Sequence, residues 1–131
     1  MAGIPLNTFK TVTKVVQQAS PANMTVPGTA PYNTQNIYAV YQAPPGTTGI
    51  VLYCQIANIG TSSYTASMWH YRPSVGVFTE VIRQIAVPPN DATIMLGGKL
   101  VLETSDMLFA SGSSPVGNLK LIASVLESAN Q

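Results

Sequence analysis

The chain has 131 residues, a net charge of +1 at pH 7 and one cysteine, Cys54. This length suits one domain and is too short for two ordinary ones. The basic residues are scattered, which excludes the basic stripe of a nucleic-acid-binding protein and the polybasic segment of a membrane-surface protein. A single thiol also excludes an intramolecular disulfide framework.

The low charge of the chain points to assembly with other proteins. Only 8% of the residues are charged, against about a quarter in an average soluble domain. Ser, Thr, Asn, Gln, Gly and Pro must therefore cover the surface. Few charges need desolvation when such a surface is buried, so it tolerates close contact with other neutral surfaces. The alternative is a monomer that merely has little charge.

Neither end of the sequence suggests export or membrane insertion. Residues 1–6 lack the charged head and long apolar stretch of a signal peptide. No run approaches the roughly 18 apolar residues of a transmembrane helix. We therefore expect a soluble chain that is made in the cytosol.

The first 36 residues are expected to form an N-terminal arm and an irregular segment. Residues 8–17 place Phe9, Thr11, Thr13 and Val15 on one face, which fits a strand or an extended arm. Residues 20–36 contain three prolines and little periodicity, as in a long functional loop. The body is expected to occupy residues 37–131.

Short stretches rich in Val, Ile, Thr, Tyr and Leu follow, separated by Pro- and Gly-containing turns. The stretch 49–59 is apolar on both faces, as a central strand should be, and 64–71 looks like its hairpin partner across the polar loop 60–63. About eight strands are expected, at residues 37–42, 49–59, 64–71, 77–87, 93–96, 99–103, 107–110 and 119–126. This pattern predicts an all-β protein with a single antiparallel β-sandwich, either a jelly roll or immunoglobulin-like.

Candidate catalytic groups are few. His70, the one histidine, could act as a base and could pair with Cys54, but a structural histidine on a half-buried strand is the simpler interpretation. Glu103 and Asp106 could form a carboxylate pair, although Asp106 is better suited to cap its turn through the backbone. No metal-ligand spacing is present. We therefore expect no enzyme activity, no metal and no cofactor.

An aromatic cluster with one cation is expected near the end of a hairpin. It consists of Trp69, Tyr71, Arg72 and Phe78. Aromatic and Arg residues are enriched at protein interfaces. The same residues could pack as core or, together with Tyr64, bind a sugar.

Several stretches resemble small virion structural proteins of tailed bacteriophages, including those that infect cyanobacteria. The resemblance covers most of the chain outside residues 20–36, which look like an insertion. It lies in residues 3–10, 43–46, 49–52, 57–58, 85–91, 96–103 and 124–127. These are turn-and-strand patterns, so the resemblance implies a many-copy particle component and brings no catalytic residues with it.

The sequence therefore predicts a virion protein that decorates or cements the head shell. Its expected partners are copies of itself and the major capsid protein or other virion proteins, with no nucleic acid and no membrane. The alternatives are a neck, tail or baseplate subunit and a carbohydrate-binding module. The residues expected at protein interfaces are Ile4, Leu6, Phe9, Tyr32, Trp69, Tyr71, Arg72 and Phe78.

Overall fold

A computed structural model describes residues 7–16, 24–25, 36–114 and 116–129. These residues form ten strands and no helix, so no described helix could cross a membrane. The expected all-β fold is confirmed, and the strand ends differ from the expected ones by a few residues. The strands are β1 (Asn7–Val16), β2 (Met24–Thr25), β3 (Asn36–Gln42), β4 (Thr47–Asn58), β5 (Tyr64–Arg72), β6 (Val77–Val87), β7 (Asp91–Ile94), β8 (Leu100–Leu102), β9 (Met107–Gly112) and β10 (Leu119–Ala129).

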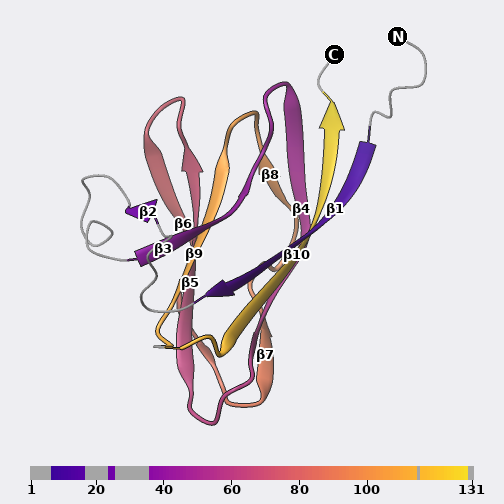
Figure 1. Cartoon of the computed structure of the whole chain (residues 1–131). Coiled ribbons are helices and arrows are strands. Elements are labelled where there is room, and N and C mark those ends of the chain that lie inside the picture. The colour runs from indigo at the N-terminus through magenta and orange to yellow at the C-terminus, as the bar shows by residue number, and fades with distance from the viewer. Residues whose placement is uncertain (1–6, 17–23, 26–35, 115, 130–131) are drawn as a thin grey trace.

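The strands form two antiparallel sheets, which face each other in Figure 1. One has the order β1-β10-β4-β7, with β8 also pairing with β4, and we call it the β10 sheet. The other has the order β2-β3-β9-β5-β6, and we call it the β9 sheet. The short β2 is left aside here, and β7 and β8 are counted as one strand because both pair with β4. The first strand then pairs with the last (β1 with β10), the second with the next to last (β3 with β9), and the inner strands likewise (β4 with β7 and β8, β5 with β6). This nested pairing is a jelly roll, which decides against the immunoglobulin-like alternative.

The core lies between the two sheets and follows the two-residue periodicity of their strands. On β10 the inward side chains are fully or almost fully buried, as expected from their alternation; they are Leu119, Leu121, Ala123 and Val125. The facing β9 sheet contributes Met68, Leu108 and Ala110. Leu102 is fully buried and Leu100 packs against this core, so β8 turns both leucines inward.

The hairpin expected between β4 and β5 is wrong. β4 pairs with β10, β7 and β8, whereas β5 pairs with β6 and β9, so the loop between β4 and β5 crosses from one sheet to the other. The buried side chain of Asn58 holds this corner: its Nδ2 donates to the carbonyls of Ser62 at 2.7 Å and Val87 at 3.0 Å, and its Oδ1 accepts from the N–H of Gly60 at 2.9 Å. Both edges of β4 are already occupied, so no edge is left for β5.

The N-terminal strand belongs to the β10 sheet. The ten residues of β1 pair in unbroken register with β10, from Asn7 opposite Ser128 to Val16 opposite Leu119. Within the expected arm of residues 1–36, residues 7–16 are thus a strand of the sandwich. Apart from the short β2, the remainder of that arm lies outside the described residues.

The edge strand β6 departs from the two-residue alternation of a regular strand. Val87 is buried and Val81 and Ile85 pack against the core, but Val77 is 47% exposed. The register of β6 with β5 shifts twice, and Gln84 adopts a φ of 48°. These irregularities are β-bulges, which break the two-residue period of a strand.

Candidate assembly surface

The outward side of the β10 sheet carries rows of apolar side chains that run across its strands. Residues directly opposite each other on neighbouring strands point to the same side of a sheet. The register therefore places Phe9, Leu126, Ile50 and Val101 in one row across β1, β10, β4 and β8. Phe9 is 75% exposed and Val101 is 52% exposed, so both ends of this apolar row are open to solvent.

A second row crosses the sheet nearer β7. It consists of Thr13, Ile122, Gln55 and Ile94, and both isoleucines are exposed. Tyr53 lies between the two rows and is also exposed. Exposed apolar side chains that share one face, rather than being scattered singly, mark a site of interaction. We call the outward side of the β10 sheet the outer face.

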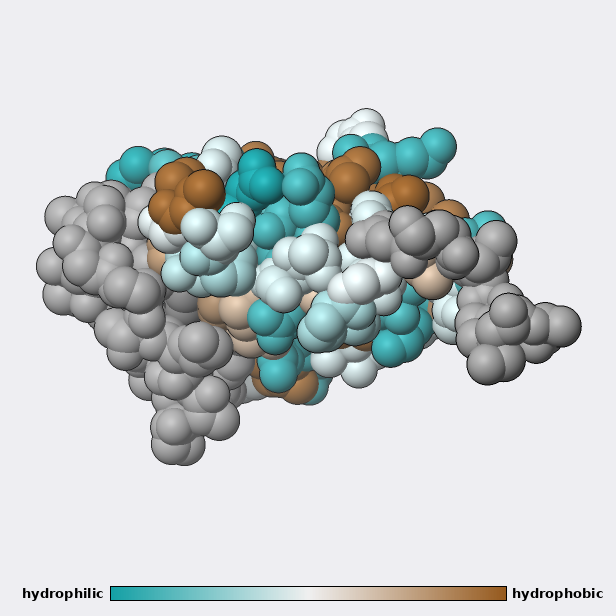
Figure 2. Space-filling model, turned by 90° about the horizontal axis from the view of Figure 1, so that it is seen from above, coloured by the Kyte–Doolittle hydropathy of each residue, from teal (hydrophilic) through white to brown (hydrophobic). Residues whose placement is uncertain are grey.

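The outer face carries little charge. Its row nearest the β4–β5 corner is Val15, Lys120, Ala57 and Ala92, and Lys120 is the one ionic side chain in the rows that the described strands form. In the view from above, the described surface is a mosaic of brown apolar residues among pale and teal ones (Figure 2). Contact with another uncharged surface would therefore cost little desolvation energy.

Part of the outer face is hollowed between β1, β10 and β4. The hollow is open, has a volume of about 450 Å³ and could receive a side chain from a partner. Its lining is mostly apolar or neutral and includes two lysine residues; the lining residues are Thr13, Lys14, Val15, Gln55, Ala57, Lys120, Leu121 and Ile122. A concave apolar site of this kind is where interface anchors gain most.

The β9 sheet keeps its outward aromatic side chains buried. Trp69 and Phe109 lie opposite each other on β5 and β9 and are each 2% exposed. They form a second hydrophobic cluster that includes the partly buried Tyr71 and Phe78, whose rings stack with centroids 4.1 Å apart. The core interpretation of Trp69 is therefore the one that the structure supports. A sugar could not stack on this ring, because no face of it is open.

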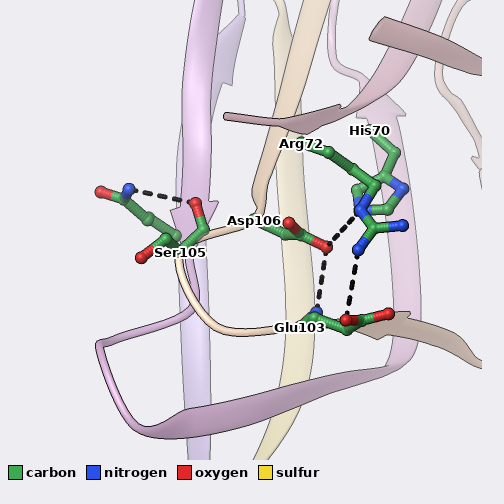
Figure 3. Close-up of polar contacts among 6 residues, drawn as sticks. His70, Arg72, Glu103, Ser105 and Asp106 are labelled. Atoms are coloured by element: carbon green, nitrogen blue, oxygen red, sulfur yellow. Dashed lines mark hydrogen bonds and ion pairs between the residues drawn. The ribbon is translucent and has the colours of Figure 1, made fainter. Parts of the chain in front are cut away.

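Arg72 belongs to a polar cluster at one end of the sandwich rather than to the aromatic cluster (Figure 3). Asp106 is its buried centre: Oδ2 accepts from the N–H of Glu103 at 3.0 Å, and it lies 3.1 Å from His70 Nε2 and 3.6 Å from Arg72 Nε. Arg72 also forms an ion pair with Glu103 at 3.2 Å. The N–H of Asp106 in turn donates to the carbonyl of Glu103 at 2.9 Å, which closes the turn.

This polar cluster has a structural role. The expected turn cap by Asp106 is confirmed, although the side chain bonds backward to Glu103 rather than to a later residue. A buried carboxylate needs partners, and His70 and Arg72 supply them. Asp106 thereby ties the β8–β9 turn to β5.

Cys54 and His70 lie in different sheets, so they form no nucleophile–base pair. Cys54 is fully buried in the core, and burial raises the pKa of its thiol to about 12. The thiol is therefore uncharged and unreactive at neutral pH. Within the described residues, no group of three or more His, Cys, Asp or Glu could hold a metal ion.

Of the expected interface residues, the structure leaves Phe9 exposed on the outer face and places Trp69 in a buried cluster. Ile4, Leu6 and Tyr32 lie outside the described residues. Sequence reasoning did not single out the other exposed residues of the outer face, namely Tyr53, Ile94, Val101 and Ile122. The available signal was the apolar second face of residues 49–59, which was taken as buried but is the half-exposed outward side of β4.

Comparison with known proteins gives a distant structural likeness. No protein-family model matches the sequence, and no curated protein matches it significantly. A chain of the T13 particle of infectious bursal disease virus aligns over 96% of this chain and 36% of its own length, with a TM-score of 0.47 and 10% identity. A chain of the Gt strain of that virus aligns over 95% and 33%, with a TM-score of 0.42 and 10% identity. This chain thus spans about one third of either, and TM-scores below 0.5 do not establish a shared fold.

Proposed function

We propose that this chain is a structural subunit of a virus particle that binds neighbouring coat proteins through its outer face. The observation that carries the proposal is the pair of exposed apolar rows on a surface with almost no charge. The jelly-roll fold alone does not indicate this function, because capsid proteins, lectins and cupins all have that fold. The virus context is supported by the turn-and-strand stretches that resemble phage virion proteins.

The outer face is large enough for a specific contact. Four strands about 4.8 Å apart and roughly nine residues long give a footprint of about 550 Å². This is close to the roughly 600–1,000 Å² that each partner buries in an interface of standard size. Its occupant is expected to be a flat, apolar and uncharged protein surface, because a strongly charged partner would lose its hydration without finding countercharges.

Within virion proteins, we propose the role of a head decoration or cement subunit. A component that binds only the assembled shell stabilises that shell by mass action. Many weak copies are enough, and a neutral surface allows them to lie close together. The purified virion should then hold the chain in numbers comparable to the major shell protein. Quantitative mass spectrometry of virions measures this ratio, and a dozen or so copies would instead place the chain in the neck or tail.

The surface itself is tested by changing its centre. Ile122→Glu places a carboxylate in the apolar row, and particles made with this variant should hold at least about tenfold fewer copies, since removing a carboxylate from water in a neutral interface costs several kcal/mol. The matched control is Val75→Glu, which changes an exposed apolar residue away from the outer face, in the turn between β5 and β6. Circular dichroism confirms that both variants fold. Equal incorporation of the two would contradict the outer face as the attachment surface.

A further inference from the structure

The first strand of the β10 sheet presents a long and regular free edge. Among the described residues, β1 hydrogen-bonds to β10 alone, and Figure 1 shows it as the outermost strand beside β10. Its ten residues contain no proline or glycine, and their register with β10 shows no bulge. They are rich in Thr and Val, which favour extended structure. A regular edge of this kind is a template for another strand.

The other described sheet edges are short or irregular. The edge strand β6 is interrupted by two register shifts and by the positive φ of Gln84. At the far side of the β10 sheet, β7 has four residues and β8 has three. Short strands and bulges prevent edge-to-edge pairing. Among the described edges, β1 therefore offers another strand the longest unbroken run of backbone groups.

We propose that two copies of this chain pair through β1, antiparallel and centred on Thr11. In this register Thr11 lies opposite Thr11 of the second copy, and Phe9 lies opposite Thr13. The pairing extends over residues 7–15, and a twofold axis relates the copies. This inference deepens the proposed function, and its role in a particle rests on that function.

The lysines of β1 restrict the register of this pairing. Centring on Thr11 places Lys10 opposite Val12 and Lys14 opposite Thr8, so no two lysines are directly opposite and like charges meet only diagonally. Centring on Val12 would place Lys10 opposite Lys14 twice, which is destabilising. Lys10 is in addition balanced within its own chain, because its Nζ lies 3.4 Å from the carboxylate of Glu127. Centring on Phe9 or Thr13 also avoids lysine pairs but shortens the pairing.

Pairing in this way would join the two outer faces into one. A twofold axis perpendicular to the sheet keeps both outer faces on the same side. The apolar row that ends in Phe9 then continues, through Thr13 of the second copy, into that copy's row of Ile122 and Ile94. The attachment surface doubles without any further contact, which raises avidity for a shell that repeats its binding site.

The register is tested by oxidising single-cysteine variants of the full chain. Thr11→Cys places two thiols opposite each other across the twofold axis, with Cα atoms about 4.5–5.5 Å apart, within reach of a disulfide. Thr13→Cys is the matched control on the same exposed face of β1. Its two thiols would lie four positions apart along the strands, about 13 Å, which is too far. The native Cys54 is buried and should not react.

We expect Thr11→Cys to form covalent dimers on a denaturing gel and Thr13→Cys to form less than about a tenth as much. Mixing Phe9→Cys with Thr13→Cys should restore crosslinking as a heterodimer. Equal crosslinking of the two single threonine variants, or none in either, would overturn the proposed pairing. If dimers form but do not bind particles, the proposed function is contradicted and the pairing is not. If the chain binds particles but forms no dimer, only the pairing through β1 is contradicted.

Discussion

The outward sides of the two sheets differ in how far their apolar side chains are exposed to solvent. On the β9 sheet, Trp69 and Phe109 are almost fully buried with Tyr71 and Phe78 packed against them. On the β10 sheet, exposed apolar residues stand in rows with no described side chain over them, and Phe9 is 75% exposed. The first set of residues is packed against side chains of the same chain. The second set has no such packing partners among the described residues.

This difference separates stability from assembly. Removing a buried side chain costs transfer energy and leaves a cavity, whereas an exposed side chain contributes little to the folded state. Changes to the buried aromatic cluster of the β9 sheet should therefore lower the stability of the fold, and changes on the outer face should leave the fold intact and affect association.

The largest effect is expected for Trp69→Ala. Truncating a fully buried tryptophan should lower the free energy of unfolding by about 3–5 kcal/mol. Urea unfolding followed by circular dichroism measures this loss, and Trp69→Phe, which keeps an aromatic ring, should lose less. A loss below about 1 kcal/mol would contradict the difference between the two sheets, because the aromatic cluster would then contribute little to stability.

An intermediate loss of stability is expected at alkaline pH, because of a thiol on the buried inward side of β4. The pKa of Cys54 rises by burial from its ordinary value near 9 to about 12. Its contribution to stability is therefore complete below pH 9 and is lost as the pH rises from 9 towards 12, at about 1.4 kcal/mol per pH unit. Burial, followed by the hydrogen bond to Glu127 and the charge of that carboxylate, also raises the pKa of Tyr41 above its ordinary value of 10, which adds a further loss of stability above pH 10.

The measurement is the free energy of unfolding at pH 8, 9 and 10 for the wild type and for Cys54→Val. The variant keeps the packing and lacks the thiol, so its stability should fall less steeply above pH 9. Identical slopes would show that Cys54 titrates in the folded chain as it does in the unfolded one.

The smallest effect is expected for Val101→Thr on the outer face. It should change the free energy of unfolding by less than about 0.5 kcal/mol. The matched variant Val51→Thr makes the same change on the inward side of the neighbouring strand β4, where the side chain is fully buried. Burying its hydroxyl should cost about 1–3 kcal/mol. Similar values for the two variants would remove the distinction between an open and a sealed side of this sheet.

The strands could be predicted from the sequence because proline and glycine mark most of the turns. Pairs such as Pro88-Pro89 end a strand locally, since they fix φ and remove backbone donors. Which strands pair is a long-range property, and the hairpin across residues 60–63 shows the limit. A short polar loop can close a hairpin or cross between sheets, and here the contacts of Asn58 with Ser62 and Val87 hold the crossing.

The candidate site was only partly predictable for a related reason. The alternation on residues 8–17 correctly grouped Phe9 with Thr11, Thr13 and Val15, but a two-residue period does not say which side faces the core. The apolar second side of β4 predicted burial, because sequence alone cannot separate a side covered by the same chain from one that awaits a partner. Turn chemistry, by contrast, is local, and the capping role of Asp106 could be predicted from its position.

The position of β10 has a consequence for how the chain is made. β10 is the last strand in the sequence, yet it lies between β1 and β4 at the centre of its sheet. During synthesis β1 has no neighbour until β10 emerges, and strand pairing between such distant segments is slow. The rows on the outer face, which all include a residue of β10, therefore form only after this strand has been made. A chain that stops before β10 therefore lacks these rows, and under the proposed function it could not bind through the outer face.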